Sequence, residues 1–320
     1  MADERPTVSV VIAAYNAERW IAGAIRSVLG QDYPVLEVIV VDDGSTDATR
    51  EVVAPFQEPV RYVFQENAGS AAARNHGIRL ARGELVAFLD ADDLWLPGKL
   101  AAQVACLQAH PDCGWCYTDA WLVDASTRSK KVRLSQLAAM PEGWVLEALL
   151  LSNFVPFSSA LVRREALEAV GGFREGPDRR ISEDWDLWLR IAAHYPVCRV
   201  AEPLVLIRDH ADRKTGTAAL DELVCARVRI VEEAVARHPE LRRLRRVALA
   251  GIYEGAGRKA LVRGHRAQAR RLLGRAVQMD PGRLRRWGYW LAAWMPAAVR
   301  RLAGRLRSWW WQRTHANVNA

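Results

Sequence analysis

The stretch 85–97 constrains this chain most, because an apolar run ends there abruptly in three carboxylates. Residues 85–89 are apolar in continuous succession, which is typical of a strand buried on both faces of a sheet. Asp90, Asp92 and Asp93 then lie at its carboxyl end, where open parallel sheets place their ligands. The Asp-x-Asp spacing lets two carboxylates face one hard divalent cation, and such ions usually also hold substrate phosphates. Taken alone, the same acids could merely cap the following helix.

The rest of the first half alternates between strand-like and helix-like segments. Apolar runs predict strands at 8–14, 36–41, 60–64, 85–89 and 114–118. Helical periodicity lies between them, after a cap at Asn16 and over 70–82 and 98–109. This alternation predicts an α/β fold with a mostly parallel sheet flanked by helices. Asp42 and Asp43 end the strand 36–41, so two acidic clusters should meet at one edge, which helix capping alone does not predict.

Six short segments carry a resemblance to a known family. They are VSVVIAAYN, VIVVDDGSTD, NAGSAAARNHGI, GELVAFLDADD, SALVRREAL with its following GGF, and SEDWDLWLR. In this order and spacing they resemble the family 2 inverting glycosyltransferases, which have the Rossmann-like GT-A fold. The resemblance covers residues 6 to about 212. One departure is Ala13, where many relatives have proline, and we expect that change to be tolerated.

The resemblance implies a nucleotide site at the sheet edge. It assigns nucleotide binding to Ala13, Ala14, Tyr15, Asp42, Asp43, Arg74, Asp90 and Ala91. Asp43 is expected to accept a hydrogen bond from the base ring, as in recognition of a uracil or thymine N–H. Asp42 or Asp43 could instead be a turn former before Gly44. Arg74 could equally pair with the acidic loops as scaffold.

The resemblance also implies a metal and a general base. Asp92 is the first candidate for direct ligand of Mg²⁺ or Mn²⁺, with Asp90 beside it and His210 approaching the ion, although a lone loop histidine is more often a surface residue. Asp184 matches the general base of the family, and Glu183 would support the acceptor or a neighbouring loop. Acids in the first turn of a helix capped by Ser182 also have a purely structural explanation.

The expected reaction moves a sugar from a nucleotide-sugar donor, UDP- or dTDP-linked, to an acceptor hydroxyl with inversion. A glycan, and in particular a lipid-linked one in envelope or cell-surface polysaccharide synthesis, is the expected acceptor. Two alternatives stay open at this point. One is a sugar-phosphate nucleotidyltransferase, although such enzymes usually open with a Gly-rich phosphate loop where AAYNAE stands here. The other is a catalytically silent adaptor that docks on a membrane.

Charge divides the chain into an acidic part and a basic part. From Ala218 onward it has 22 Lys and Arg against 7 Asp and Glu, within a whole-chain net charge of +8. We therefore predict a GT-A domain at 1–217 and a helical extension at 218–281, with helices at 220–238 and 241–259. The segment 256–281 resembles one tetratricopeptide-type helix pair. Residues 282–320 form a basic, Trp-rich amphipathic tail.

The tail predicts contact with a membrane surface. Residues 283–313 hold six Trp and eight Arg, the residue types that an interfacial helix uses at lipid boundaries and anionic headgroups. An amphipathic helix covering the core is the plainer alternative, and nucleic-acid binding is disfavoured. No window of about 18 uncharged apolar residues exists, so we expect no membrane span. The predicted location is cytoplasmic, peripheral on the inner face of the cell membrane.

Five cysteines, at 106, 113, 116, 198 and 225, follow no signal peptide, which favours free thiols in a reducing compartment. Cys113 and Cys116 form a single CxxC. A zinc or redox site would need a second such pair or an oxidoreductase setting, and the sequence displays neither. Both residues are therefore interpreted as part of a buried strand.

Overall fold

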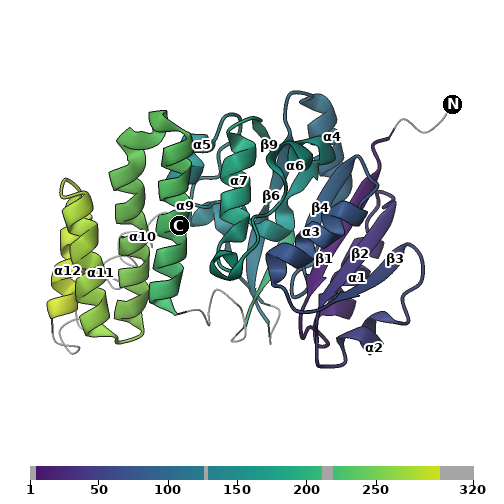
Figure 1. Cartoon of the computed structure of the whole chain (residues 1–320), viewed down its shortest axis with the longest axis horizontal. Coiled ribbons are helices and arrows are strands. Elements are labelled where there is room, and N and C mark those ends of the chain that lie inside the picture. Colours follow the sequence, from purple (N-terminus) through teal and green to yellow (C-terminus); the bar gives the residue numbers. More distant parts are fainter. Residues whose placement is uncertain (1–4, 126–128, 211–218, 296–320) are drawn as a thin grey trace, which may run out of the picture. The chain divides into compact units, whose positions relative to one another are not determined.

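The computed structural model describes residues 5–125, 129–210 and 219–295 (Figure 1). The chain divides into two compact units, Met1–Ala218 and Ala219–Ala320, called here the sheet unit and the helical unit.

The sheet unit is built on one nine-stranded mixed sheet. Its order is β3 (Val60–Gln65), β2 (Glu37–Asp43), β1 (Val8–Ala14), β4 (Leu85–Asp90), β8 (Leu161–Arg163), β6 (Trp115–Asp124), β9 (Val197–Asp209) and β5 (Leu94–Trp95), with β7 (Lys130–Arg133) paired to β6. The strands β3, β2, β1 and β4 are mutually parallel, as the alternating segments predict. The strand β8 is antiparallel to both β4 and β6, so it separates the two parallel parts.

Helices cover both faces of this sheet. They are α1 (Ile21–Leu29), α2 (Thr49–Val53), α3 (Ser70–Leu80), α4 (Lys99–Ala109), α5 (Leu146–Leu151), α6 (Arg164–Val170) and α7 (Glu183–Ala192). The apolar sides of α1 and α4 pack with alternate residues of β1, β2 and β4 in one core. On the other face Gly77 of α3 meets Val11, and a Cβ there would lie only 2.4 Å from Val11 Cγ1. The ring of Trp188 in α7 stacks on Trp115, with centroids 5.2 Å apart.

Two local predictions need correction. Asn16 does not cap the first helix, because α1 begins at Ile21 with Trp20 at its N-cap position. Asn16 instead has a positive φ of 48° and its Oδ1 accepts a hydrogen bond of 2.8 Å from Thr46 N, which ties the loops after β1 and β2 together. Ser182 does occupy the N-cap of α7, but its side chain makes no capping hydrogen bond.

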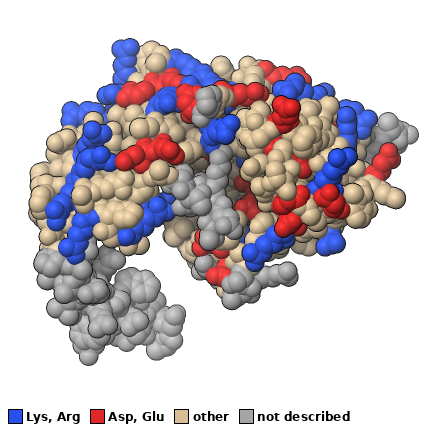
Figure 2. Space-filling model, turned by 60° about the horizontal axis from the view of Figure 1, so that its bottom comes forward, with Lys and Arg blue, Asp and Glu red and all other residues tan. Residues whose placement is uncertain are grey.

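The helical unit contains α9 (Leu220–Arg237), α10 (Arg242–Val262), α11 (Arg266–Met279) and α12 (Leu284–Trp294). Gly257 lets α10 and α11 approach closely, since a Cβ there would lie 2.7 Å from Leu273 Cγ. The predicted helix pair 256–281 therefore falls on α10 and α11, although its tetratricopeptide character stays a prediction. Lys and Arg side chains gather on the surface of this unit (Figure 2).

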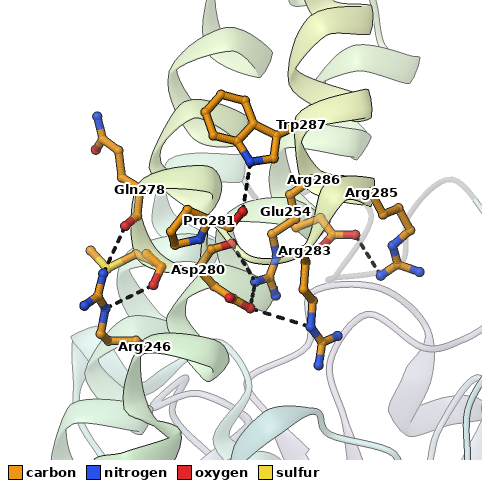
Figure 3. Close-up of polar contacts among 10 residues, drawn as sticks. Arg246, Glu254, Gln278, Asp280, Pro281, Arg283, Arg285, Arg286 and Trp287 are labelled. Carbon is orange, nitrogen blue, oxygen red and sulfur yellow. Dashed lines mark hydrogen bonds and ion pairs between the residues drawn. The ribbon is translucent and has the colours of Figure 1, made fainter.

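A buried ionic cluster fixes the start of α12. The Arg286 side chain, 3% exposed, donates from Nε to Glu254 of α10 over 3.1 Å and also pairs with Asp280 (Figure 3). Arg285 reaches the other oxygen of Glu254 at 3.0 Å. Trp287 Nε1 donates to the carbonyl of Pro281 over 2.9 Å. These contacts fix the orientation of α12 within the helical unit. They therefore also fix which of its side chains are exposed.

Candidate active site

The acids that end β4 form a compact group. One carboxylate oxygen each from Asp90, Asp92 and Asp93 lies within 4.8 Å of the others. Asp93 is buried and accepts hydrogen bonds from Ser158 Oγ at 2.6 Å and from the Arg208 backbone N–H at 3.2 Å. The side chains of Asp90 and Asp92 stay 32% and 26% exposed. The two predicted metal ligands, Asp90 and Asp92, are therefore accessible to solvent, whereas Asp93 stabilises the loop that follows β4.

His210 is brought to this group by β9. Its Nε2 lies 2.9 Å from Asp92 Oδ2, and its buried Nδ1 has no hydrogen-bond partner among the described residues. The neighbouring Arg208 donates from NH1 to the carbonyl of Asp92 over 2.9 Å. Carboxylate oxygens and an imidazole nitrogen are suitable ligands for Mn²⁺, and Mg²⁺ prefers the oxygens. The arrangement fits a divalent ion at Asp92 with Asp90 and His210 beside it.

A cavity of about 220 Å³ lies beside the acids. It is lined by Ala13, Ala14, Tyr15, Asp43, Asn67, Gly69, Ser70 and Arg180. Four of the predicted nucleotide residues are in this lining, at the carboxyl ends of β1 and β2. Ala91 is buried between the metal-candidate acids, and Ala91 and Asp90 lie outside the lining.

Asp43 is held rigidly at the cavity wall. Its Oδ1 accepts from Gln65 Nε2 and Ala68 N at 2.8 and 2.9 Å, and its Oδ2 accepts from Gly69 N at 2.8 Å. Gly69 needs its positive φ of 98° to make this approach. A carboxylate has about four acceptor positions, so one remains for a ligand.

Asp42 has different surroundings from Asp43. It is 1% exposed, and it accepts from Ser45 N at 2.8 Å and from the Tyr62 hydroxyl at 2.7 Å. Burial and this carboxylate together raise the pKa of Tyr62 well above its ordinary value. Asp42, near the end of β2, thus stabilises the turn that follows the strand through its bond with Ser45, and it does not line the cavity.

Arg74 links the two acidic parts of the site. Its guanidinium is buried, donates to Asp90 Oδ1 over 2.8 Å and to Glu183 Oε1 over 2.9 Å, and lies 3.8 Å from the ring centroid of Phe157. Ser70 also donates its hydroxyl to Glu183. Arg74 and Glu183 are therefore both engaged with the scaffold around the site.

Asp184 stands beside that pair at the start of α7. Burial raises its pKa above the ordinary 3.8, and the negative charge of Glu183 raises it further. Arg74, the backbone N–H of Trp185 and the Asn153 amide oppose this rise; Asn153 Nδ2 donates to Asp184 Oδ2 over 2.9 Å. A carboxylate with a raised pKa is a better proton acceptor, which is the property that a general base requires.

Sequence reasoning missed several residues of this site. Arg180 lines the cavity and forms no ion pair with a described carboxylate. Its only signal is its position in a basic loop just before the SEDWD segment. Asn67, which also lines the cavity, donates from Nδ2 to the Asp43 carbonyl over 2.9 Å. Ser158 donates to Asp93 and accepts from the Asp90 backbone N–H over 3.1 Å.

Solved structures with a similar fold bind nucleotide-sugars. TarS from S. aureus, solved in complex with UDP-GlcNAc, matches with a TM-score of 0.62 at 18% identity, over 85% of this chain and 81% of that chain. The mannosyltransferase PcManGT from Pyrobaculum calidifontis, solved with GDP-Man and Mn²⁺, matches with a TM-score of 0.55 at 24% identity, over 93% and 87%. These likenesses establish the GT-A fold.

Sequence comparison identifies the family. A glycosyltransferase of uncharacterized function from Nostoc is 38% identical over 174 residues, which are 51% of this chain and 52% of that protein, so the chain spans about half its length. TuaG of Bacillus subtilis, provisionally named a teichuronic acid biosynthesis glycosyltransferase, is 31% identical over 195 residues, 60% of this chain and 74% of TuaG. The model of glycosyl transferase family 2 matches residues 9–171. The chain therefore belongs to glycosyltransferase family 2.

Proposed function

We propose that this chain transfers a sugar from a UDP- or dTDP-linked donor to an acceptor hydroxyl with inversion, in the synthesis of a cell-surface or envelope glycan. The observation that carries the proposal is the buried bridge from Asp90 through Arg74 to Glu183. This bridge joins the acids proposed to bind the metal and the diphosphate, Asp90 and Asp92, to the neighbourhood of the candidate base Asp184. The similarity to TuaG, which is provisionally named a teichuronic acid biosynthesis glycosyltransferase, supports a surface polysaccharide as the product class.

The cavity supports a pyrimidine donor. Uracil and thymine each present one ring N–H next to carbonyl groups, and Asp43 keeps one acceptor position at the cavity wall. A charge-assisted hydrogen bond to that N–H is stronger than a neutral one, so it can select these bases. The exposed ring of Tyr15 stands at the rim, where it can stack on the base.

The acidic group supports a metal-dependent reaction. Asp92 and Asp90 would hold Mg²⁺ or Mn²⁺, and His210 would offer a nitrogen ligand to the same ion. The bound ion offsets the negative charge that grows on the diphosphate leaving group. Asp93 keeps the loop in shape through Ser158 and Arg208. Arg180, which forms no ion pair with the carboxylates of the described residues, is a candidate for a further contact to donor phosphate at the cavity.

Asp184 is the proposed general base. Inversion in a single displacement requires one base on the acceptor side, and Asp184 is separated from the metal acids by Arg74 and Glu183. Asn153 orients the carboxylate, which takes the proton of the acceptor hydroxyl as that oxygen attacks the sugar. Glu183 acts through Arg74 and Ser70 and is a positioning residue.

The helical unit is proposed to dock on an anionic membrane surface. In α12, Trp287, Leu291 and Trp294 are 38%, 51% and 55% exposed, and the side chain of Arg285, which also pairs with Glu254, is 65% exposed. Trp and Arg together suit the lipid boundary. Residues 296–320, the rest of the predicted tail, lie outside the described residues. Within the described parts of the chain, none of the helices combines the length and apolarity needed to span a bilayer.

Isothermal titration with UDP, dTDP and GDP, each with and without Mn²⁺, tests the donor site on the wild type and on Asp92→Asn. We expect one uridine or thymidine diphosphate to bind only with the ion, and the substitution to weaken that binding. Asp112→Asn, an exposed acid after α4, is the matched control. Absence of nucleotide binding under every condition would refute the proposal.

A further inference from the structure

A second group of metal-binding side chains lies at the far end of α4 from the acidic loop. Cys106, His110 and Cys198 each offer one ligand atom, and these atoms lie within 4.8 Å of one another. Cys106 is in the last turn of α4 and His110 follows four residues later, so the two side chains share one face of the helix end. Cys198 comes from β9, 92 residues after Cys106 in the sequence.

A third thiol belongs to the same group. Cys116 of β6 is paired in register with Cys198 of the parallel neighbour β9, so their side chains point to the same face of the sheet. The thiols of Cys116 and Cys198 are close enough to Cys106 to lower the pKa of its thiol. All of these cysteines are free thiols. Cys116 of the lone CxxC therefore has thiols from α4 and β9 as neighbours, which the linear sequence did not indicate.

The group is open to water on one side. His110 is exposed and Cys106 is half-buried, whereas Cys116 and Cys198 are buried in the core. The Nδ1 atom of His110 lies 2.9 Å from the carbonyl of Cys106. A histidine that donates Nδ1–H to a carbonyl keeps the lone pair of Nε2 for a metal, which is the usual outer-shell arrangement of metal-binding histidines.

We propose that Cys106, His110 and Cys198 bind one thiophilic divalent metal ion of the Zn²⁺ class, with Cys116, the register partner of Cys198, as the fourth ligand. Three sulfur ligands and one nitrogen ligand form a tetrahedral set that zinc favours, with ligand atoms about 3.5 to 3.8 Å apart when zinc–sulfur bonds are about 2.3 Å. The ligand atoms of Cys106, His110 and Cys198 lie within 4.8 Å of one another, so a bound ion would draw them closer together. Binding releases the thiol protons to solvent, one for each coordinated sulfur.

The buried Lys99 supports a negatively charged metal centre. Three thiolates around a divalent ion leave one net negative charge. Burial lowers the pKa of Lys99 to about 7, and negative charge at Cys116 opposes that shift, so a thiolate centre would favour the ammonium form. Lys99 donates to Gln103 Oε1 over 2.6 Å and lies 3.9 Å from the Trp95 ring centroid, so no carboxylate neutralises it in these contacts.

The two metal sites differ in chemistry. Asp90 and Asp92 offer oxygens, which suit Mg²⁺ or Mn²⁺, whereas sulfur ligands select softer ions. An ion at the thiol site would join α4, β6 and β9. Since α4 follows the acidic loop and β9 leads to His210, the thiol site would brace the elements that carry the candidate active site. This inference does not depend on the proposed transfer reaction.

Cobalt titration of the reduced, metal-free full-length chain tests the site. Co²⁺ bound by thiolates gives sulfur-to-metal charge-transfer bands in the near ultraviolet and intense visible bands when tetrahedral, and oxygen ligands give neither. We expect these bands to saturate at one Co²⁺ per chain, to be abolished by Zn²⁺ and to persist in excess Mg²⁺. Wild-type protein without the charge-transfer bands would overturn the proposal.

Three variants locate the ligands. His110→Ala removes an exposed ring and should leave the fold intact, while weakening cobalt binding by more than about tenfold, because even an outer-shell loss costs about 10- to 100-fold. Cys106→Ser should remove one sulfur and reduce the charge-transfer intensity. Cys225→Ser, which changes the exposed thiol of α9, is the matched control and should match the wild type. Wild-type cobalt affinity in both His110→Ala and Cys106→Ser would refute the assignment.

Discussion

The Nε2 atom of His210 lies 2.9 Å from Oδ2 of Asp92, although 118 residues separate them in the sequence. The contact places a neutral or cationic imidazole against the acid proposed to bind the metal. His210→Ala should therefore weaken Mn²⁺-dependent UDP binding and lower kcat/KM by about 10- to 100-fold, or about 1.4 to 2.7 kcal/mol. Isothermal titration and initial-rate assays measure both effects. His265→Ala, which changes an exposed histidine of the helical unit, is the control, and equal losses in the two variants would contradict a specific role of His210.

Asp184→Asn tests the proposed base. The amide cannot accept the proton of the acceptor hydroxyl, so kcat should fall by about 10²- to 10⁴-fold while UDP affinity stays near the wild-type value. Because the pKa of Asp184 is raised, the acid limb of the pH profile of kcat/KM should lie above pH 3.8. The Asn153 amide opposes that rise, so Asn153→Ala should move the limb to higher pH. A limb that stays in place in Asn153→Ala would count against Asp184 as the titrating group.

Glu183→Gln tests the buried bridge. The change removes the charge that faces Arg74, whose side chain is 10% exposed, and breaking such a buried pair costs about 3 to 5 kcal/mol. Urea unfolding followed by tryptophan fluorescence should report a free energy of unfolding lowered by about this amount. Arg79→Gln, on the exposed face of the same helix α3, should change it by less than about 0.5 kcal/mol. Equal stability of the two variants would refute the structural role of the bridge.

Asp43→Asn distinguishes the two neighbouring acids at the end of β2. The variant loses a charged acceptor at the cavity, so UDP and dTDP affinity should fall by about 1.5 to 3 kcal/mol, which is about 10- to 150-fold. Asp42→Asn changes an acid that bonds to Ser45 and Tyr62 and should lower stability with little effect on nucleotide affinity. Titration calorimetry and urea unfolding on both variants separate these outcomes; the reverse pattern would exchange the two assignments.

The exposed Trp residues of α12 predict lipid binding. The double variant Trp287→Ala and Trp294→Ala removes apolar surface that is 38% and 55% exposed, so co-sedimentation with anionic vesicles should decrease several-fold. Binding should also weaken as salt rises, because Arg contacts to headgroups are screened. Trp144→Ala, which changes a Trp that is 70% exposed in the sheet unit, is the matched control. Unchanged sedimentation of the double variant would contradict docking through α12.

The sequence predicted the first four strands well, because β1, β2 and β4 are apolar runs buried on both faces and β3, though half exposed, is rich in branched and aromatic residues. The short strand β8 gave no such signal: its three residues, Leu161–Arg163, are ordered by pairing with β4 and β6 on either side. Asn16 is a good helix cap by residue type, but its amide bonds to the loop after β2, a contact that local propensity cannot reveal. The alternating pattern therefore predicts the parallel half of the sheet and not the inserted strand.

The site shows the same division between local and distant information. The acids at 90 and 92 and the pair at 183 and 184 stand in short motifs, so their residue types and spacing could be interpreted directly. Arg74 was left undecided between ligand and scaffold, because its partners come from β4 and α7. The CxxC at 113 and 116 was interpreted as part of a buried strand, and both residues are buried. The register of Cys116 with Cys198, and the approach of Cys198 to Cys106 and His110, could not be predicted from the sequence. Contacts of this kind depend on tertiary packing.

The reversed direction of β8 has a consequence for how such a site can diversify. A strand that runs against β4 begins where β4 ends, so the segment before it arrives at the same edge as the acids, and Ser158 there contacts both Asp90 and Asp93. The nucleotide-binding part of the site is formed by the ends of β1, β2 and β4. Residues 134–157 belong instead to the segment that precedes β8 and reaches the same edge of the sheet from the other direction. Insertions or replacements in residues 134–157 can therefore change the shape of the acceptor-binding surface, while the strands that hold the nucleotide keep their register.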